Sequence, residues 1–170
     1  MYIETERLII TEFTLDMAPV VQANSMDEDN MRFVPDEVWE TVEETKEVLE
    51  FLISQYGSCE GPFVYPVLLK KSHENIGYVQ LCPIEDENWE VGYHIAKQYT
   101  GNDYASEAVQ SFLPVITKDL GISQVHGICL ADNKASIGVM RKCGFENIYT
   151  GIGEYQGDQR EIIRNLWKNE

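Results

Sequence analysis

Two side chains in this sequence suit chemistry on a protonated amine. Glu90 lies between Trp89 and Val91, and burial among apolar neighbours raises the pKa of a carboxyl group, which prepares it to act as a general base. Such a base removes a proton from an alkylammonium group, whose pKa is about 10. His94 is a second candidate base, because alternation along a strand places it on the same face as Glu90. Each residue also has a plainer interpretation, Glu90 as a solvated carboxylate and His94 as a structural histidine.

The segment Gln98-Tyr99-Thr100-Gly101-Asn102-Asp103-Tyr104-Ala105 has the form of an anion-binding turn. An extended run precedes it and a helical pattern begins at Tyr104. Unpaired backbone N–H groups therefore gather at the positive end of a helix dipole, where phosphate and other anions bind. By itself, a glycine in a strand-to-helix turn serves equally well to reach a positive φ.

The elements that position these groups follow from hydrophobic periodicity and turn residues. Helices are expected at 14–23, 41–57, 104–120 and 133–143, and 24–39 is expected to be a loop. Strands are expected at 7–13, 63–71, 75–83, 89–97, 123–130, 146–155 and 161–167. This order predicts an α+β fold, a mixed and mostly antiparallel twisted sheet of about seven strands flanked by helices.

Local signals refine two of the helices. Thr41 and Glu44 form a capping box, in which the Glu44 carboxylate bonds back to the cap nitrogen. The helix 104–120 has an apolar inward face and ends at Gly121, and Pro114 is expected to kink it.

Length and charge limit the class of protein. A chain of 170 residues fits a single domain, 1–170, with its own core. The net charge of −16 argues against nucleic acid as a partner and favours a cationic one, although such acidity also simply keeps a protein soluble. The four cysteines show no metal-ligand spacing and are expected to be reduced, mostly buried thiols. Neither an export signal nor a membrane span is indicated, so no membrane partner and a cytoplasmic location are expected.

Four separated motifs together resemble one family. The segment from Gln98 to Ala108 resembles the pyrophosphate loop of the GNAT superfamily of N-acetyltransferases, and Asn133-Lys134-Ala135-Ser136 with Lys142-Cys143-Gly144-Phe145 resembles its second CoA-side motif. Thr5-Glu6-Arg7-Leu8 and Glu90-Val91-Gly92-Tyr93 are similar to the RimJ/RimL branch. The resemblance spans essentially the whole chain in the right order. It implies the GNAT fold and an acetyl-CoA-dependent N-acyltransferase.

The resemblance also implies roles for individual residues. Glu90 is the general base, a backbone N–H near Ile95 stabilises the oxyanion, and Ser136 is offered to the CoA sulfur. Many relatives use a tyrosine where this chain has Met140, and a thioether donates no proton. The residues expected to contact acetyl-CoA are Tyr93, His94, Ile95, Gln98, Gly101, Asn102, Asp103, Tyr104, Ala105, Asn133 and Ser136.

Two of these positions carry further expectations. Asp103 replaces the last small residue of the family loop, so its carboxylate is expected to cap the following helix and to repel the pyrophosphate. Asn133 is expected to cap its helix and also to reach the pantetheine arm, while Ser136 has the alternative role of bonding that cap.

The acceptor is expected to be a small-molecule or peptide amine, cationic in character, with a protein N-terminus as one possibility. Its site is expected between 14–55 and the hairpin segment 151–155, near acidic Glu28, Asp29, Asp36 and Glu37, although such charge runs are commonly solvated surface. Transfer is expected by direct attack in a ternary complex. The alternative is a GNAT-like module that binds acyl-CoA or a protein partner without catalysis. A homodimer is possible.

Overall fold

A computed structural model describes residues 1–169 of the chain and shows one sheet of eight strands. The strand order is β1-β2-β3-β4-β5-β6-β8-β7, and every neighbouring pair is antiparallel except β5 with β6. The strands are β1 (Ile3–Glu4), β2 (Leu8–Ile10), β3 (Phe63–Leu69), β4 (Asn75–Pro83), β5 (Trp89–Ile95), β6 (Gln124–Leu130), β7 (Glu146–Tyr155) and β8 (Asp158–Lys168). The expected mixed, mostly antiparallel sheet is confirmed. It has one strand more than expected, β1, whose two residues are too few to form a pattern in the sequence.

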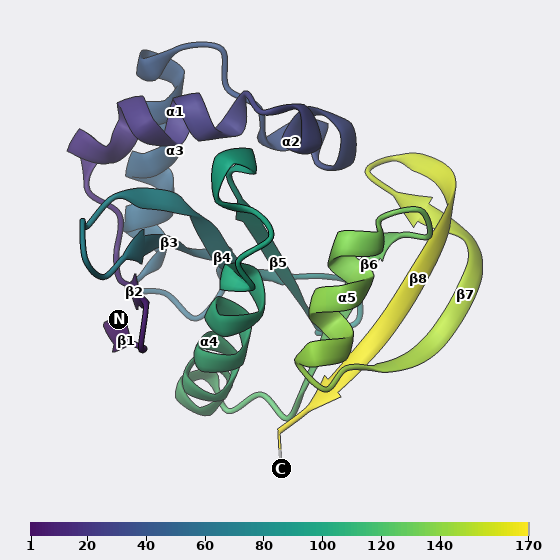
Figure 1. Ribbon diagram of the computed structural model, residues 1–170. Coiled ribbons are helices and arrows are strands. Elements are labelled where there is room, and N and C mark those ends of the chain that lie inside the picture. Colours follow the sequence, from purple (N-terminus) through teal and green to yellow (C-terminus); the bar gives the residue numbers. More distant parts are fainter. Residues whose placement is uncertain (170) are drawn as a thin grey trace.

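Helices cover both faces of this sheet (Figure 1). The near face in the figure carries α4 and α5, and the opposite face carries α1 and α3, with α2 beyond them at one end. The helices are α1 (Ala18–Ser25), α2 (Glu28–Phe33), α3 (Val42–Gln55), α4 (Tyr104–Leu120) and α5 (Lys134–Lys142), with 3₁₀ turns η1 (Leu15–Met17), η2 (Pro35–Glu37) and η3 (Lys97–Tyr99).

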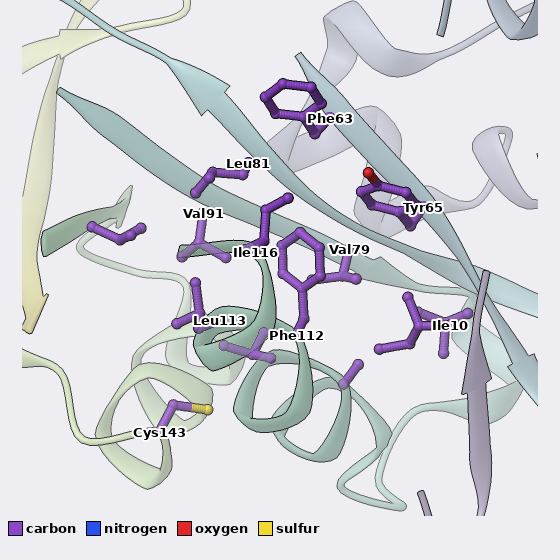
Figure 2. Packing of buried hydrophobic residues seen from close by; sticks show 14 of the residues in the cluster. Ile10, Phe63, Tyr65, Val79, Leu81, Val91, Phe112, Leu113, Ile116 and Cys143 are labelled. Atoms are coloured by element: carbon purple, nitrogen blue, oxygen red, sulfur yellow. The ribbon is translucent and has the colours of Figure 1, made fainter. Parts of the chain in front are cut away.

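Strand alternation divides the apolar residues into two clusters, one on each face. In β3, Phe63, Tyr65 and Val67 pack toward α4, while Val64 packs toward α1 and α3. Phe112 of α4 is fully buried among these strands, as Figure 2 shows, and its ring centroid lies 5.7 Å from that of Tyr65. The larger cluster therefore fixes α4 against the centre of the sheet.

The strands β5 and β6 separate soon after they meet. Their parallel pairing is limited to Glu90 opposite His126, whereas β4 pairs with β5 along seven residue pairs. Beyond Glu90 the two strands therefore leave a gap in the middle of the sheet. The side chains of Glu90 and His94 lie on the α1 face, with Gly92 between them, and those of Val91, Tyr93 and Ile95 pack on the α4 face, as alternation predicts.

Two expectations about local structure are wrong. The segment 24–39 is not a loop, because Asp27 caps α2 by accepting from the Asn30 N–H at 2.7 Å and η2 follows directly. The capping box at Thr41 is partly altered: Thr41 accepts from the Glu44 N–H, but the Glu44 carboxylate accepts from Glu40 N–H rather than from the cap nitrogen. Pro114 lies inside α4, which extends from Tyr104 to Leu120 on both sides of it.

The start of the chain clamps the start of α4. Glu107, in the first turn of α4, accepts hydrogen bonds from the Thr5 hydroxyl at 2.6 Å, the Arg7 Nε–H at 2.7 Å and the Arg7 backbone N–H at 3.1 Å. The Arg7 guanidinium also lies 4.7 Å from the centre of the Tyr104 ring. These contacts hold the N-terminal end of α4 in place. Residues 1–169 contain no helix whose length and apolar character suffice to span a membrane.

Candidate active site

A cavity of about 450 Å³ lies where β5 and β6 separate. On the α4 face it is bounded by residues of α5, including Ser136, Val139 and Met140. On the α1 face it is bounded by Phe33 and Val34 near the end of α2, and by Glu37 of η2. Residues of both β5 and β6 line the cavity. The cavity therefore passes through the gap between these strands and connects the two faces of the sheet. Its lining is largely apolar, with a few polar groups that converge on the gap.

Glu90 lies on the α1 face at the point where the strands part. Burial raises the pKa of its carboxyl group to about 7, against the opposing effects of the Arg164 charge and of the Ile128 N–H that donates to the carboxylate. The charge of Glu37 contributes to the same rise. Near neutral pH, Glu90 therefore exchanges a proton readily, as a general base must.

His94, the second candidate base, faces α2. Its Nε2 lies 2.9 Å from the Asp27 carboxylate, without the alignment of a hydrogen bond. Burial lowers the pKa of His94 in spite of the Asp27 charge, so the ring is neutral near pH 7. The side chain lines the cavity, but on the α1 face, away from the residues of α5. The contact with Asp27 favours a structural role.

The α4 face of the gap carries a pair of hydroxyl groups. The hydroxyl oxygens of Tyr93 on β5 and Ser136 on α5 lie 2.8 Å apart, and the Ser136 carbonyl, 3.2 Å from the Tyr93 oxygen, is the other acceptor within reach of the single Tyr93 proton. Asn133 caps α5 by accepting from the Ser136 N–H at 3.0 Å, as expected. The Ser136 backbone N–H therefore bonds the cap, and its hydroxyl meets that of Tyr93. Met140 is buried below, where Asn165 Nδ2–H donates to its sulfur at 2.9 Å.

Backbone N–H groups of β5 point into the gap. The Ala96 N–H donates to the Ile76 carbonyl of β4 at 2.8 Å. Because N–H groups alternate between the two sides of a strand, the Ile95 N–H faces the other way, toward the space that β6 has left. This is the position expected for a donor to an oxyanion.

The turn before α4 has the geometry of an anion site. Gly101 has a φ of +80° and Asp103 a φ of +62°, and α4 begins at the next residue. Thr100 and Ala105 border the cavity on either side of this turn. The first N–H groups of α4 have no partner within the helix, and the Glu107 N–H makes the first helical bond, to the Asp103 carbonyl at 3.0 Å. The phosphates of a nucleotide fit this arrangement.

The expectation that the Asp103 carboxylate caps α4 is wrong. The carboxylate accepts no hydrogen bond from the helix. Because Asp103 is in the left-handed conformation, its side chain points away from the first turn and pairs with Lys142 at the end of α5. Its hydrogen bond with Lys142 lowers the Asp103 pKa. The first N–H groups of α4 therefore stay available to an anion, and the nearby negative charge of Asp103 is paired with Lys142.

The α1 half of the cavity is acidic and aromatic. Glu37 accepts hydrogen bonds from the Tyr78 hydroxyl and, at 3.0 Å, from Gln80 Nε2–H. Across the opening, the Tyr155 hydroxyl near the tip of the β7–β8 hairpin donates to the Phe33 carbonyl at 2.9 Å. This hydrogen bond connects the two segments between which the acceptor site was expected.

The structure brings together most of the predicted site residues. Those that line the cavity are Glu90, Tyr93, His94, Ile95, Ala105, Asn133 and Ser136. Those that build the anion turn outside the cavity are Gln98, Gly101, Asn102, Asp103 and Tyr104. Sequence reasoning missed the bond between Tyr93 and Ser136 and the pairing of Asp103 with Lys142. The cysteines are free, and Cys129 and Cys143 are buried as expected, whereas Cys59 is exposed.

Comparison with known proteins agrees with this geometry. Residues 7–146 match the family described as "Acetyltransferase (GNAT) domain". The chain is 30% identical over 145 residues to YnaD, an uncharacterised N-acetyltransferase of Bacillus subtilis, covering 85% of this chain and 82% of YnaD.

Two solved structures share the fold along its whole length. A GNAT-family acetyltransferase from Bacillus anthracis superposes with a TM-score of 0.83 at 23% identity, covering 99% of this chain and 98% of that one. RimL, a ribosomal L7/L12 α-N-protein acetyltransferase in complex with coenzyme A, superposes with a TM-score of 0.84 at 18% identity and the same coverage. With the family match over residues 7–146, these likenesses show that the chain belongs to the GNAT family of acetyl-CoA-dependent N-acetyltransferases.

Proposed function

We propose that this protein acetylates a cationic primary amine by direct attack on acetyl-CoA in a ternary complex, with Glu90 as the general base. The observation that carries this proposal is the cavity through the gap between β5 and β6. It has Glu90 on the α1 face and the Tyr93–Ser136 pair on the α4 face. The α4 face is the donor side and the α1 face is the acceptor side.

On the donor side, the pyrophosphate of acetyl-CoA binds the N-terminal end of α4 at the turn of Gly101 and Asp103. The pantetheine arm runs along the start of α5, past Asn133 and Ser136, and brings the thioester to the gap. The Ile95 N–H then donates to the thioester oxygen as it becomes negative. Both partners of the reaction meet at the edge of β5.

The chemical steps need one base and a stabilised leaving group. Glu90 accepts a proton from the ammonium, and the neutral amine attacks the thioester carbon. The C–S bond then breaks, and the amide nitrogen loses its second proton as the thiolate becomes the CoA thiol. The Ser136 hydroxyl, held by Tyr93, donates to the sulfur as its charge grows. A thiol pKa of about 8.5 makes the thiolate a fair leaving group, so no strong acid is required.

The acidic acceptor side supports a cationic substrate. Of the described residues that line the cavity, Asp29, Glu37, Glu90 and Glu154 carry carboxylates, and none is Lys or Arg. A positively charged amine is therefore attracted to this opening and retained there. Small amines and peptide N-termini both fit this description.

An acceptor screen tests the proposal. Thiol release from acetyl-CoA is measured with diamines, monoamines, amino sugars and short peptides that vary at the N-terminus. The proposal predicts thiol release with at least one cationic primary amine, accompanied by an N-acetyl product of the expected mass. If acetyl-CoA raises the melting temperature but no amine is acetylated, the chain is a binding module instead. If no CoA ligand changes the melting temperature, donor binding is refuted as well.

A further inference from the structure

Glu37 carries a partly buried carboxylate that pairs with no cation among the residues that the structure describes. It lies in η2, half-buried on the acceptor side, and its two oxygens accept from the Tyr78 hydroxyl and the Gln80 amide. Among residues 1–169, no Lys, Arg or His nitrogen lies within 4.0 Å of this carboxylate. Two neutral donors do not offset the cost of removing a carboxylate charge from water. A positively charged partner would offset it, and Glu37 has none within the described part of the chain. Burial accordingly raises the Glu37 pKa.

The floor of the acceptor side holds Glu37 close to the reacting position. Gln80 lies opposite Gly92, where an added Cβ would come within 2.5 Å of the Gln80 amide nitrogen. The absence of a side chain at Gly92 therefore makes room for the amide that binds Glu37. Glu90 is the diagonal neighbour of Gln80 on this face, and Cα atoms in such pairs are about 7–8 Å apart. Glu37 and Glu90 thus lie on neighbouring parts of one cavity wall.

The two carboxylates have different tasks during the reaction. Once Glu90 has taken its proton, the attacking nitrogen is neutral and compensates no charge on Glu37. A monoamine therefore leaves Glu37 unpaired at the moment of attack, whereas a substrate with a second ammonium group pairs it throughout.

From this arrangement we propose that Glu37 forms a second ammonium subsite, and that the acceptor is a small aliphatic amine with two positive charges. This inference rests on the proposed function, in which Glu90 takes the proton of the reacting nitrogen. Phe33, Val34 and Tyr155 also line this half of the cavity and suit the methylene groups that join the two nitrogens. Asp29 and Glu154 add negative charge to the lining of the same cavity. The hydrogen bond from Tyr155 to Phe33 spans the opening, which favours a small substrate over a folded protein.

The test compares two acceptors with the same four-carbon chain, 1,4-diaminobutane and n-butylamine, which differ in the second amino group. For the wild type, kcat/KM is expected to be at least ~30-fold higher for the diamine. In Glu37→Gln, which keeps the shape and one acceptor oxygen, the ratio is expected to fall to near 1, mainly through a higher KM for the diamine. Asp36→Asn removes an equal charge from the preceding residue, which is exposed and lies outside the cavity lining. In this control variant the ratio is expected to stay as in the wild type.

The outcomes separate this inference from the proposed function. If the wild type acetylates both amines with similar kcat/KM, or if Glu37→Gln and Asp36→Asn lower the ratio equally, the second subsite is refuted while the enzyme assignment stands. If the wild type acetylates neither these amines nor any other, the proposed function fails and this inference fails with it. Melting temperatures of all variants, measured with and without acetyl-CoA, confirm that each is folded. Glu37→Asp, which keeps the charge, is expected to retain a preference for the diamine.

Discussion

The hydroxyl oxygens of Tyr93 and Ser136 lie 2.8 Å apart and join β5 to the start of α5 across the donor side. Burial raises the pKa of Tyr93 above its usual range, so the phenol stays protonated and remains a hydrogen-bond donor. The Tyr93 hydroxyl makes its hydrogen-bond contacts with the hydroxyl and the carbonyl of Ser136. In the proposed mechanism, Tyr93 is therefore a positioning residue that orients the Ser136 hydroxyl toward the CoA sulfur.

Substitution of this pair tests its role as a unit. Ser136→Ala is expected to lower kcat about 10-fold, and Tyr93→Phe somewhat less, with little change in the Kd for acetyl-CoA. Because both residues act through one hydroxyl, the double variant is expected to resemble Ser136→Ala alone. Steady-state kinetics at saturating substrates measure these effects. Strictly multiplicative losses in the double variant would refute a joint role.

Lys142 is expected to matter more for donor binding than Asp103. In Lys142→Ala, the Asp103 carboxylate loses its partner beside the pyrophosphate site, so the Kd for acetyl-CoA is expected to rise about 3- to 10-fold. In Asp103→Gly, the left-handed conformation is retained and Lys142 is released toward the phosphates, so binding is expected to be unchanged or up to about 3-fold tighter. Calorimetric titration measures both, and weaker binding in Asp103→Gly than in Lys142→Ala would contradict this assignment.

Glu107 contributes pH-dependent stability. Burial disfavours its ionised form, but the hydrogen bonds from Thr5 and Arg7 outweigh that effect and lower the Glu107 pKa. A lowered folded-state pKa gives stability that is present above the unfolded value of 4.5 and lost as the pH falls through the folded value. Glu107→Gln is expected to lower the melting temperature by about 3 °C at pH 7 and by much less near pH 3. An equal loss at both pH values would contradict the ion pair.

Glu90 has the opposite effect on stability. Its folded-state pKa of about 7 lies above the unfolded value of 4.5, so the native state binds the extra proton between these values and stability falls as the pH rises through that range. The full difference corresponds to roughly 3 kcal/mol at high pH. Glu90→Gln is therefore expected to raise the melting temperature at pH 8 and to change it little at pH 4. A lower melting temperature at pH 8 would show that the carboxylate is stabilising.

Much of the fold follows from the chain itself. The periodicity of 104–120 and 133–143 matches α4 and α5, and the runs 75–83 and 146–155 coincide with β4 and β7. Segment 24–39 was mispredicted because short polar helices such as α2 carry little periodic signal. The strand β1 escaped prediction because two residues have no pattern of their own.

The candidate site was likewise predictable only in part. The motifs correctly indicated the turn before α4, the cap at Asn133 and the face of β5 that carries Glu90. Contacts between distant residues depend on how separate elements pack, so the Tyr93–Ser136 and Asp103–Lys142 pairs had no signal in the sequence. The sequence carries no signal for the separation of β5 from β6, which the single residue pair between these strands demonstrates.

The role of Glu90 as the base is tested most directly by the pH dependence of kcat, at saturating acetyl-CoA and amine. The wild type is expected to lose about 10-fold in kcat for each pH unit below an apparent pKa of about 7, a value that the neighbouring charges of Arg164 and Glu37 adjust in opposite directions. In Glu90→Gln, kcat is expected to fall at least ~100-fold and this dependence to disappear, with acetyl-CoA binding retained. His94→Asn, the control at the second candidate base, is expected to keep the dependence. A wild-type kcat that is constant from pH 6 to 9, or a Glu90→Gln variant with near-normal turnover, would contradict the account.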